Sequence, residues 1–293
     1  MSRESAIRLH SRRYRTLAVT GGKGGVGKSS IAVNLAMAYA QMGARPIIMD
    51  ADMGMADLNL LLGVAPAKSL VDVVHGCPVE KVLVPAHGIH LLPALNGNDC
   101  LEAMTETTRQ QIFAAIESMV PRFDTLLIDI AAGIGTNQTL FAGAAADTVV
   151  VVTADALSLA DAYASLKILS LRQGLRHAFI VPNRVRSASE AEELVMRLSS
   201  LVAQFLDISL TALPWIPYDP GVSQAAGAGI PLLSYCPDSP ASRAIREVAR
   251  RIDIHSRSHE RVGAAKLFWR SMLEVQWSLG SQNVDCHQKG TKP

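Results

Sequence analysis

Residues 20–30, TGGKGGVGKSS, hold two lysines within one glycine-rich stretch. Gly22, Gly27, Lys28 and Ser29 have the spacing GxxxxGK[ST], which is typical of a phosphate-binding loop. Glycines let backbone N–H groups curl around phosphate oxygens, and the following helix N-terminus adds a positive field. In this pattern Lys28 neutralises the β- and γ-phosphates, and the Ser29 hydroxyl binds Mg²⁺. The predicted nucleotide-binding residues of the loop are Gly22, Lys23, Gly24, Gly25, Val26, Gly27, Lys28, Ser29 and Ser30.

Three aspartates follow apolar runs that read as buried strands. The run 46–50 leads into Asp50 and Asp52, and the run 124–129 ends at Asp129. Carboxylates at strand ends beside a phosphate loop suit Mg²⁺ and the positioning of an attacking water. Ser29, Asp52 and Asp129 are therefore the predicted metal-site residues, with Asp129 reaching the ion through water. Asp50 is a secondary candidate, as a metal or lysine partner.

The elements that must position these residues alternate along the chain. Short apolar runs rich in β-branched residues alternate with helix-period segments, which indicates parallel strands buried on both faces. The predicted fold is a doubly wound α/β sheet, mostly parallel and flanked by helices, with its ligand at the strand carboxyl ends. The predicted strands are 16–20, 46–50, 89–93, 124–129, 148–153, 178–183 and 208–216. The predicted helices are 28–42, 106–119, 158–172, 188–204 and 240–252.

Bulk composition excludes several classes of protein. The 293 residues carry a net charge of +2, which gives no strong overall attraction to nucleic acid or membrane. None of the four cysteines forms a CxxC pair, so the sequence suggests no zinc or iron–sulfur site. No apolar run approaches the ~20 residues of a membrane span. We therefore expect a cytoplasmic location.

The segment KGGVGKS, 23–29, resembles the deviant Walker A motif of the MinD/ParA family of P-loop ATPases. The resemblance implies ATP and Mg²⁺ as cofactors, and a dimer in which Lys23 reaches the partner's nucleotide. It implies a catalytic set of Lys23, Lys28, Asp52 and Asp129, in which Asp52 orients or activates the attacking water. Phosphoryl transfer needs charge compensation beyond one lysine and Mg²⁺, which gives the second cation a physical reason.

The same resemblance extends to the second switch and the adenine site. AAGIG, 131–135, is similar to the family's second switch, where Gly133 lets the backbone approach the γ-phosphate. Asn183 matches the base-reading asparagine, and IPYD, 216–219, gives Pro217 and Asp219 as further adenine contacts. Turn formation alone also explains a proline and an aspartate there. An NKxD guanine signature is absent from the sequence, which favours ATP over GTP.

Most of residues 13–279 resembles the FlhG/FleN form of this family. The segments DADMGMADLNLLLG, 50–63, and FLDISLTALPWIPYD, 205–219, carry much of this likeness. It implies a regulator of flagellar number and placement that closes as an ATP-bound dimer. The implied partners are an FlhF-like GTPase, a flagellar switch-complex protein or a flagellar transcription activator. Ile130 departs from the family's threonine and removes a hydroxyl near the γ-phosphate.

The resemblance divides the chain into five parts. Residues 1–13 form an N-terminal extension and possible partner-binding helix, and 14–254 form the ATPase domain. A linker at 255–263 precedes an amphipathic helix at 264–279, and 280–293 form a disordered tail. The helix carries an apolar stripe and implies reversible, peripheral binding to the inner, anionic face of the cell membrane.

Three other functions compete with this interpretation. A ParA-type partitioning ATPase would use the arginines of 243–261 on DNA, against which the apolar stripe of 264–279 argues. A nucleotide-binding regulator of a transcription activator would hydrolyse little ATP. An iron–sulfur carrier is disfavoured because the chain has no CxxC pair.

Overall fold

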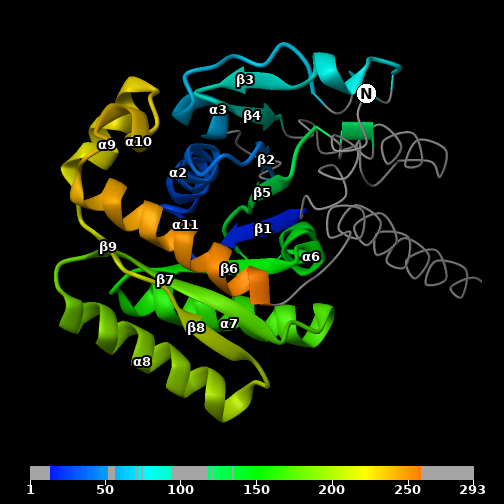
Figure 1. Ribbon diagram of the computed structural model, residues 1–293. Coiled ribbons are helices and arrows are strands. Elements are labelled where there is room, and N and C mark those ends of the chain that lie inside the picture. Colours follow the sequence, from blue (N-terminus) through cyan, green and yellow to red (C-terminus); the bar gives the residue numbers. More distant parts are fainter. Residues whose placement is uncertain are drawn as a thin grey trace, which may run out of the picture.

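The computed structural model describes residues 14–51, 57–69, 72–73, 75–93, 118–119, 122–133 and 135–258. They form a nine-stranded sheet in the order β3-β4-β2-β5-β1-β6-β7-β8, with β9 paired to β7 (Figure 1). Every strand pair is parallel except β3 with β4. The strands are β1 Arg15–Thr20, β2 Pro46–Asp50, β3 Val84–Ala86, β4 Ile89–Leu92, β5 Thr125–Asp129, β6 Asp147–Val152, β7 His177–Val185, β8 Ser209–Ala212 and β9 Ile216–Pro217. The predicted doubly wound, mostly parallel fold is confirmed.

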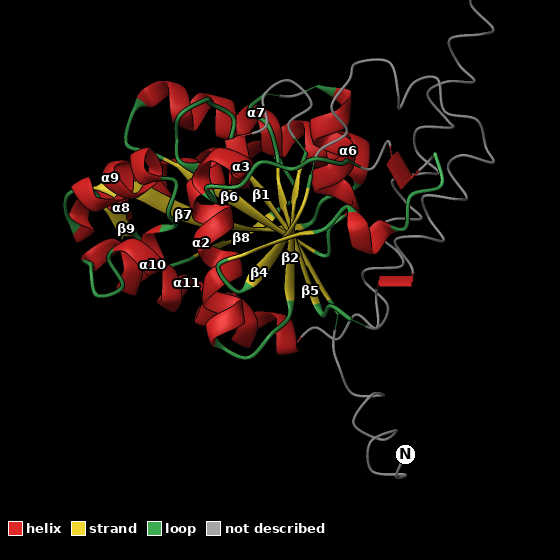
Figure 2. Ribbon diagram, turned by 90° about the horizontal axis from the view of Figure 1, so that it is seen from above, coloured by secondary structure: helices red, strands yellow, loops and turns green. Residues whose placement is uncertain are grey.

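Helices cover both faces of the sheet. Figure 2 shows α6 and α7 on one side of the strands and α2 and α11 on the other. Alternation along β1 explains the two layers, since Leu17 and Val19 pack with the core under α2 while Ala18 packs in the opposite core. The helices are α2 Lys28–Gln41, α3 Asp57–Leu61, η1 Val79–Lys81, α6 Thr136–Ala144, α7 Ala156–Gln173, α8 Ala188–Phe205, α9 Pro220–Ala228, α10 Leu232–Tyr235 and α11 Pro240–Ser258.

The structure corrects two predicted elements. The expected strand 208–216 is two short strands, β8 and β9, which pair with different parts of β7. Pro214 lies between them and lacks the N–H that a continuous ladder needs. The last helix runs to Ser258, so residues 255–258 of the expected linker are helical. Most of the predicted helix 106–119 lies outside the described residues.

The C-terminal end of α11 packs against the amino ends of the strands, at the edge of the sheet opposite the phosphate loop. Asp253 forms an ion pair with Arg15 at the start of β1. The His255 ring stacks on the His177 ring of β7, with the two ring centroids 4.8 Å apart. Both contacts hold α11 against the sheet. Because α11 also packs against α2, they help to fix this helical layer.

Candidate nucleotide site

The loop between β1 and α2 ends in a helix N-terminus that no side chain caps. Gly27 precedes the first helical residue with φ 96° and ψ 20°, in the left-handed region that favours glycine, and no side chain caps the helix. The first N–H groups of a helix lack intrahelical acceptors and carry a partial positive charge. The local geometry therefore offers an anion site at the carboxyl end of β1, where the sequence predicts phosphate.

Lys28 lies inside this loop. Lys28 is only 8% exposed. Its ammonium donates a hydrogen bond to the Lys23 carbonyl, with 3.3 Å between Nζ and the oxygen. Lys28 thus turns back over its own loop, where it can meet the phosphates of a nucleotide bound to the same chain.

Two buried carboxylates face the same helix. Asp50 and Asp129 end the adjacent strands β2 and β5 as direct register partners, and they are 5% and 4% exposed. Alternation places both on the α2 side, because Ile48 and Leu127 of these strands pack in the core under α2. Ser29 is the second residue of α2, in its first turn. Carboxylate and hydroxyl oxygens are ligands that Mg²⁺ accepts, so these residues fit the ion.

Lys23 points outward, unlike Lys28. Its side chain is 40% exposed, and its Nζ lies 3.0 Å from Oδ1 of Asp155. Asp155 is the N-cap of α7, where it accepts from the Ser158 N–H, and it also accepts from the Thr153 hydroxyl. The Thr153 hydroxyl first, then the Ser158 N–H and Lys23, lower the pKa of Asp155 to about 2, although burial opposes the shift. The lysine is therefore held by a carboxylate that stays ionised at neutral pH.

Asn183 contacts the phosphate loop itself. It is 6% exposed, and its Nδ2 donates to the Val26 carbonyl at 2.7 Å. A Cβ on Gly27 would lie 2.6 Å from the same Nδ2, so the loop passes close to this amide. The next residue, Arg184, reaches the Gly25 carbonyl at 3.3 Å. The predicted base-reading residue is thus part of the wall that supports the loop.

The other two predicted adenine residues, Pro217 and Asp219, have different surroundings. β9 pairs Ile216 with Asn183 and Pro217 with Val185, which brings Pro217 next to the end of β7. Asp219 caps α9 by accepting from the Gly221 N–H, and it also accepts from the Ala241 N–H of α11. Asp219 therefore has a structural role as a helix cap, and its contact with adenine stays a prediction.

The structure places two of the three remaining residues from the sequence analysis, Gly133 and Ile130, but not Asp52. Gly133 has φ 109°, a conformation that favours glycine, and a Cβ there would meet open space. Asp52 lies outside the described residues. Ile130 is 1% exposed and packs in the core on the side opposite α2. Its side chain therefore points away from the two buried carboxylates.

Sequence reasoning missed three residues of this site, namely Thr153, Asp155 and Arg184. Asp155 carried a usable signal, because an aspartate directly after a β-rich run and before a helical segment is a typical N-cap. Arg184 carried none, since its position depends on the pairing of β7 with β9. A positive φ of 59° turns Arg184 toward the loop, at an irregularity in that pairing.

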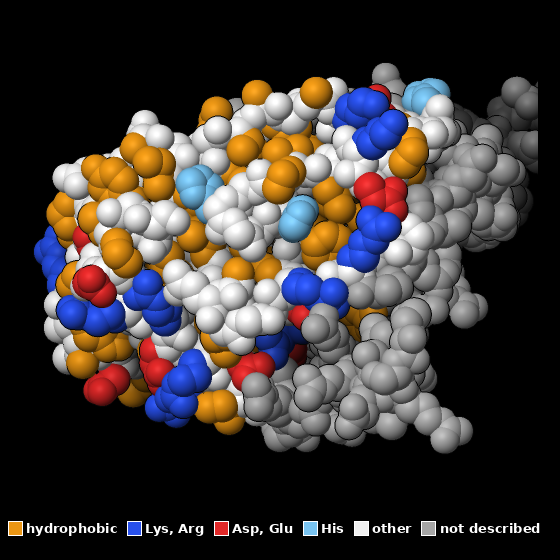
Figure 3. All heavy atoms as spheres, turned by 45° about the horizontal axis from the view of Figure 1, so that its top comes forward, with side chains coloured by type: hydrophobic (Ala, Val, Ile, Leu, Met, Phe, Trp, Pro, Cys, Tyr) orange, Lys and Arg blue, Asp and Glu red, His pale blue; other side chains and the backbone are white. Residues whose placement is uncertain are grey.

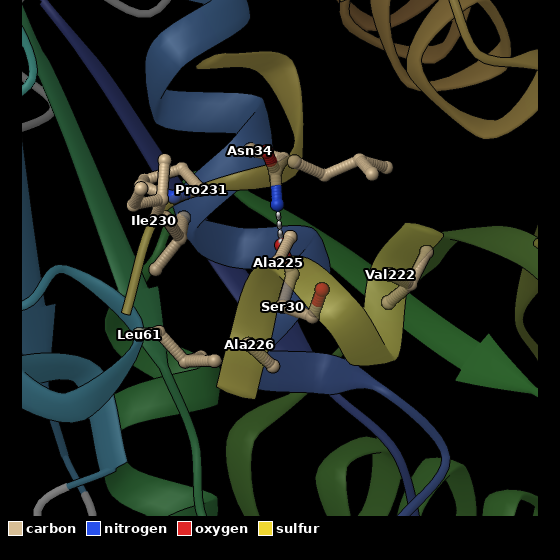
Figure 4. A pocket seen from close by; sticks show the side chains of 10 residues that line it. Ser30, Asn34, Leu61, Val222, Ala225, Ala226, Ile230 and Pro231 are labelled. Carbon is tan, nitrogen blue, oxygen red and sulfur yellow. Dashed lines mark hydrogen bonds between the residues drawn. The ribbon is translucent and has the colours of Figure 1, made fainter. Parts of the chain in front are cut away.

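A pocket lies beside the first two turns of α2 (Figure 4). It is lined mainly by apolar side chains of α2, α3, α9 and the segment before α10, among them Leu61, Val222 and Ile230. Asn34 stands at its edge, donating to the Ser30 carbonyl at 2.7 Å and accepting from the Leu233 N–H at 2.9 Å. The pocket shares Ser30 with the predicted nucleotide-binding residues, but its lining includes neither Lys28 nor Asp129.

Comparison with known proteins agrees with this geometry. A family model for ParA, described as a NUBPL iron-transfer P-loop NTPase, matches residues 13–253. The antiactivator FleN of Pseudomonas aeruginosa is 35% identical over 241 residues, covering 82% of this chain and 86% of its own. The flagellum site-determining protein YlxH of Helicobacter pylori is 31% identical over 184 residues, 62% of either chain.

Solved structures give the same result. The cell division ATPase MinD of Pyrococcus furiosus superposes with a TM-score of 0.67 at 25% identity, covering 82% of this chain and 99% of its own. A P-loop ATPase works with ATP and Mg²⁺, the two cofactors that the loop and the carboxylates accommodate. The chain belongs to the ParA/MinD family of P-loop ATPases.

Proposed function

We propose that the protein is an ATP-dependent dimerising switch in which Lys23 serves the nucleotide of the partner chain. The observation that carries this proposal is the opposite placement of two lysines in one loop. Lys28 is buried and folds over its own loop, whereas Lys23 lies at the rim with a side chain that is 40% exposed. A rim cation is accessible to a second molecule.

Transferring Lys23 to a partner costs little. Its ion pair with Asp155 is partly exposed on both sides, and exposed ion pairs typically contribute only ~0.2–1 kcal/mol. A triphosphate offers more negative charge than one carboxylate, in a site that the second chain would shield from water. An ATP-bound partner therefore competes well with Asp155 for the lysine. Two-fold symmetry makes the exchange reciprocal, so each chain gives one lysine and receives one.

Within one chain the proposed roles divide by position. Lys28 and the N–H groups at the start of α2 hold the phosphates, and Ser29 and Asp129 hold Mg²⁺, with Asp52 as the third predicted metal-site residue. The ion neutralises charge on the β- and γ-phosphate oxygens when it is bound. Asp52 would also orient the attacking water. Asn183 and Pro217 line the side on which the base would lie.

The biological role that we propose is regulation of flagellar number or placement. The likeness to FleN and YlxH over most of the ATPase domain supports it. An FlhF-like GTPase, a flagellar switch-complex protein and a flagellar transcription activator are the proposed partners. None of the helices in the described part of the chain is long and apolar enough to cross a membrane. We propose that the protein associates peripherally with the membrane through residues 264–279, which lie outside the described residues.

The structure gives little support to DNA binding by α11. Arg250 and Arg251 both pair with Glu247, and their hydrogen bonds lower the pKa of Glu247 to about 2. On the face that Figure 3 shows, Lys and Arg side chains lie among Asp and Glu side chains and form no single basic patch. The charges of Arg250 and Arg251, two of the arginines in 243–261, are thus partly neutralised by Glu247.

Mixing two variants of low activity tests the proposed trans role. In a mixed dimer of Lys23→Ala and Asp129→Asn chains, the first chain keeps Asp129 and receives Lys23 from the second. One complete site forms in each mixed dimer, so an equal mixture should recover about a quarter of wild-type turnover if subunits exchange freely. Turnover is measured as phosphate release for each variant alone and for the mixture.

The outcomes separate the alternatives. A lysine that acts within its own chain would leave the mixture as inactive as its components. Full turnover by Lys23→Ala alone would remove the lysine from catalysis. Sizing the wild-type chain with ATP·Mg²⁺, ADP and no nucleotide gives the companion result, and we expect a dimer with ATP·Mg²⁺.

Pelleting with vesicles tests the membrane role. The full chain with ATP should pellet with vesicles containing anionic lipid, whereas a chain ending at Ser258 should stay in the supernatant. Retention on plasmid DNA that weakens with salt, without vesicle binding, would favour the partitioning function instead.

A further inference from the structure

We propose that Asn183 and Arg184 are positioning residues for the phosphate loop, so that the residue expected to read the base also shapes the cradle for the phosphates. This inference rests on the proposed nucleotide site and deepens it. An asparagine whose only role was to read the base would need no contact with the loop. Here the same side chain is hydrogen-bonded to the backbone of the loop.

Consecutive residues of β7 hold consecutive carbonyls of the loop. Asn183 donates from Nδ2 to the Val26 carbonyl at 2.7 Å, and Arg184 donates from Nη1 to the Gly25 carbonyl at 3.3 Å. A carbonyl oxygen only accepts, so the Asn183 amide must present its NH₂ group to Val26. This requirement fixes the orientation of the amide and leaves Oδ1 as the atom that faces elsewhere.

The backbone of β7 brings both side chains to the loop. Phe179 and Val181 pack in the core under α2, and alternation places Asn183 on that same face. The following residue would ordinarily point to the opposite face. Arg184 instead has φ 59°, where the pairing of β7 with β9 is irregular, and it reaches the loop as well. A left-handed conformation is uncommon for a residue other than glycine, and here it aligns two donors with one loop.

Holding these carbonyls also orients the neighbouring N–H groups. In a planar trans peptide the C=O and the next residue's N–H point in opposite directions. With the Gly25 and Val26 carbonyls turned toward β7, the N–H groups of Val26 and Gly27 point away from β7. Phosphate loops bind anions through such N–H groups. Loss of either donor from β7 should therefore disorder the donors that receive the phosphate.

A ligand without a base separates positioning from base reading. We would measure the affinity of wild type, Asn183→Ala and Arg184→Ala for ATP and for inorganic tripolyphosphate, both with Mg²⁺. Asn183→Ala should weaken both ligands by about tenfold, and Arg184→Ala should weaken both by two- to threefold, as expected for loss of one buried and one exposed hydrogen bond. Unchanged tripolyphosphate affinity with weakened ATP would overturn the inference.

A substitution that keeps the shape of Asn183 sharpens the test. Asn183→Asp places a carboxylate against the Val26 carbonyl, so it should weaken tripolyphosphate at least as much as alanine does at neutral pH. The ratio of wild-type to variant affinity should fall as pH is lowered, because a protonated carboxyl regains the donor. A ratio that does not change with pH would contradict a donor role.

Controls separate this inference from folding and from the proposed function. Asn34→Ala removes another buried amide-to-carbonyl bond in α2, and it should lower the melting temperature without weakening tripolyphosphate. If Asn183→Ala weakens ligands only as much as Asn34→Ala does, the inference fails. Lack of binding of either ligand by wild type would overturn the proposed function, whereas a loss confined to ATP overturns this inference alone.

Discussion

The inner and outer parts of the loop region differ in burial and in their partners. The inner part, Lys28 with Asp50 and Asp129, has residues that are at most 8% exposed. The outer part, Lys23 with Asp155, has side chains that are 40% and 44% exposed. Both parts contain cationic and anionic side chains, yet those of the outer part are much more exposed and therefore more accessible to another macromolecule.

The difference shows where each charge can act. Buried charges are costly unless other groups compensate them, so the inner residues belong together and serve a ligand within one chain. Exposed charges exchange partners at little cost, which suits a group that changes its partner during a cycle. We therefore propose that burial separates the functions of the two lysines, which lie five residues apart.

The largest effect should come from the inner lysine. Lys28→Ala removes the cation that folds over the loop, and ATP affinity should fall about 100-fold, as for a lost charge-assisted hydrogen bond. Calorimetric titration with ATP measures it, and Lys167→Ala on the exposed face of α7 is the matched control. Equal affinity for wild type and Lys28→Ala would place the phosphates elsewhere.

Removing the inner carboxylate should affect the metal. Asp129→Asn should lower turnover by tenfold to 100-fold and raise the Mg²⁺ concentration needed for half-maximal rate, as expected for a ligand-shell residue. ATP binding in the presence of a chelator should change little. A Mg²⁺ titration of phosphate release measures both quantities, and an unshifted titration would exclude Asp129 from the metal site.

Packing of the loop against α7 gives the next effect. A Cβ on Gly22 would lie 2.1 Å from the Asp161 carbonyl carbon, whereas a Cβ on Gly24 would meet open space. Gly22→Ala should lower stability by about 1–3 kcal/mol, as overpacked substitutions do. Gly24→Ala is the matched control, and thermal unfolding of the two should differ by several degrees. Similar melting temperatures would show that the loop moves away from α7 freely.

The outer ion pair should give a smaller effect. Asp155→Asn keeps a good helix cap but removes the charge that holds Lys23. If Asp155 competes with the partner's phosphate, dimerisation with ATP should occur at about two- to fivefold lower protein concentration, as expected from the modest free energy of exposed ion pairs. Sedimentation at several concentrations measures it. A weaker dimer would mean that Asp155 guides Lys23 across the interface.

The smallest effect should appear at acidic pH. The pKa of Asp155 is lowered from 3.8 to about 2, so its ionised form contributes stability above pH 3.8. That contribution should disappear as pH falls from about 4 to 2, and Asp155→Asn should lack it. The difference in unfolding free energy between wild type and variant should therefore shrink across this range. A difference that stays constant would assign the stabilisation to groups other than Asp155.

Sequence patterns predicted the centre of the site better than its edges. GxxxxGK[ST] and the aspartate at the end of an apolar run depend on short-range spacing, and the strand order brings Asp50 and Asp129 into register as neighbours. The segment 208–216 was predicted wrongly, because its split depends on how far β7 extends as a partner. Arg184 could not be predicted for the same reason. Its φ and its contact arise from pairing with residues more than thirty positions away.

Asp155 has one more consequence for an ATP-driven cycle. Its carboxylate is fixed by the Thr153 hydroxyl and the Ser158 N–H, independently of Lys23. In the proposed exchange, this acceptor would keep its position and charge when the lysine departs, and no side chain would have to rearrange before the lysine returns. We expect such a ready acceptor to favour rapid resetting of each chain after the triphosphate has been hydrolysed.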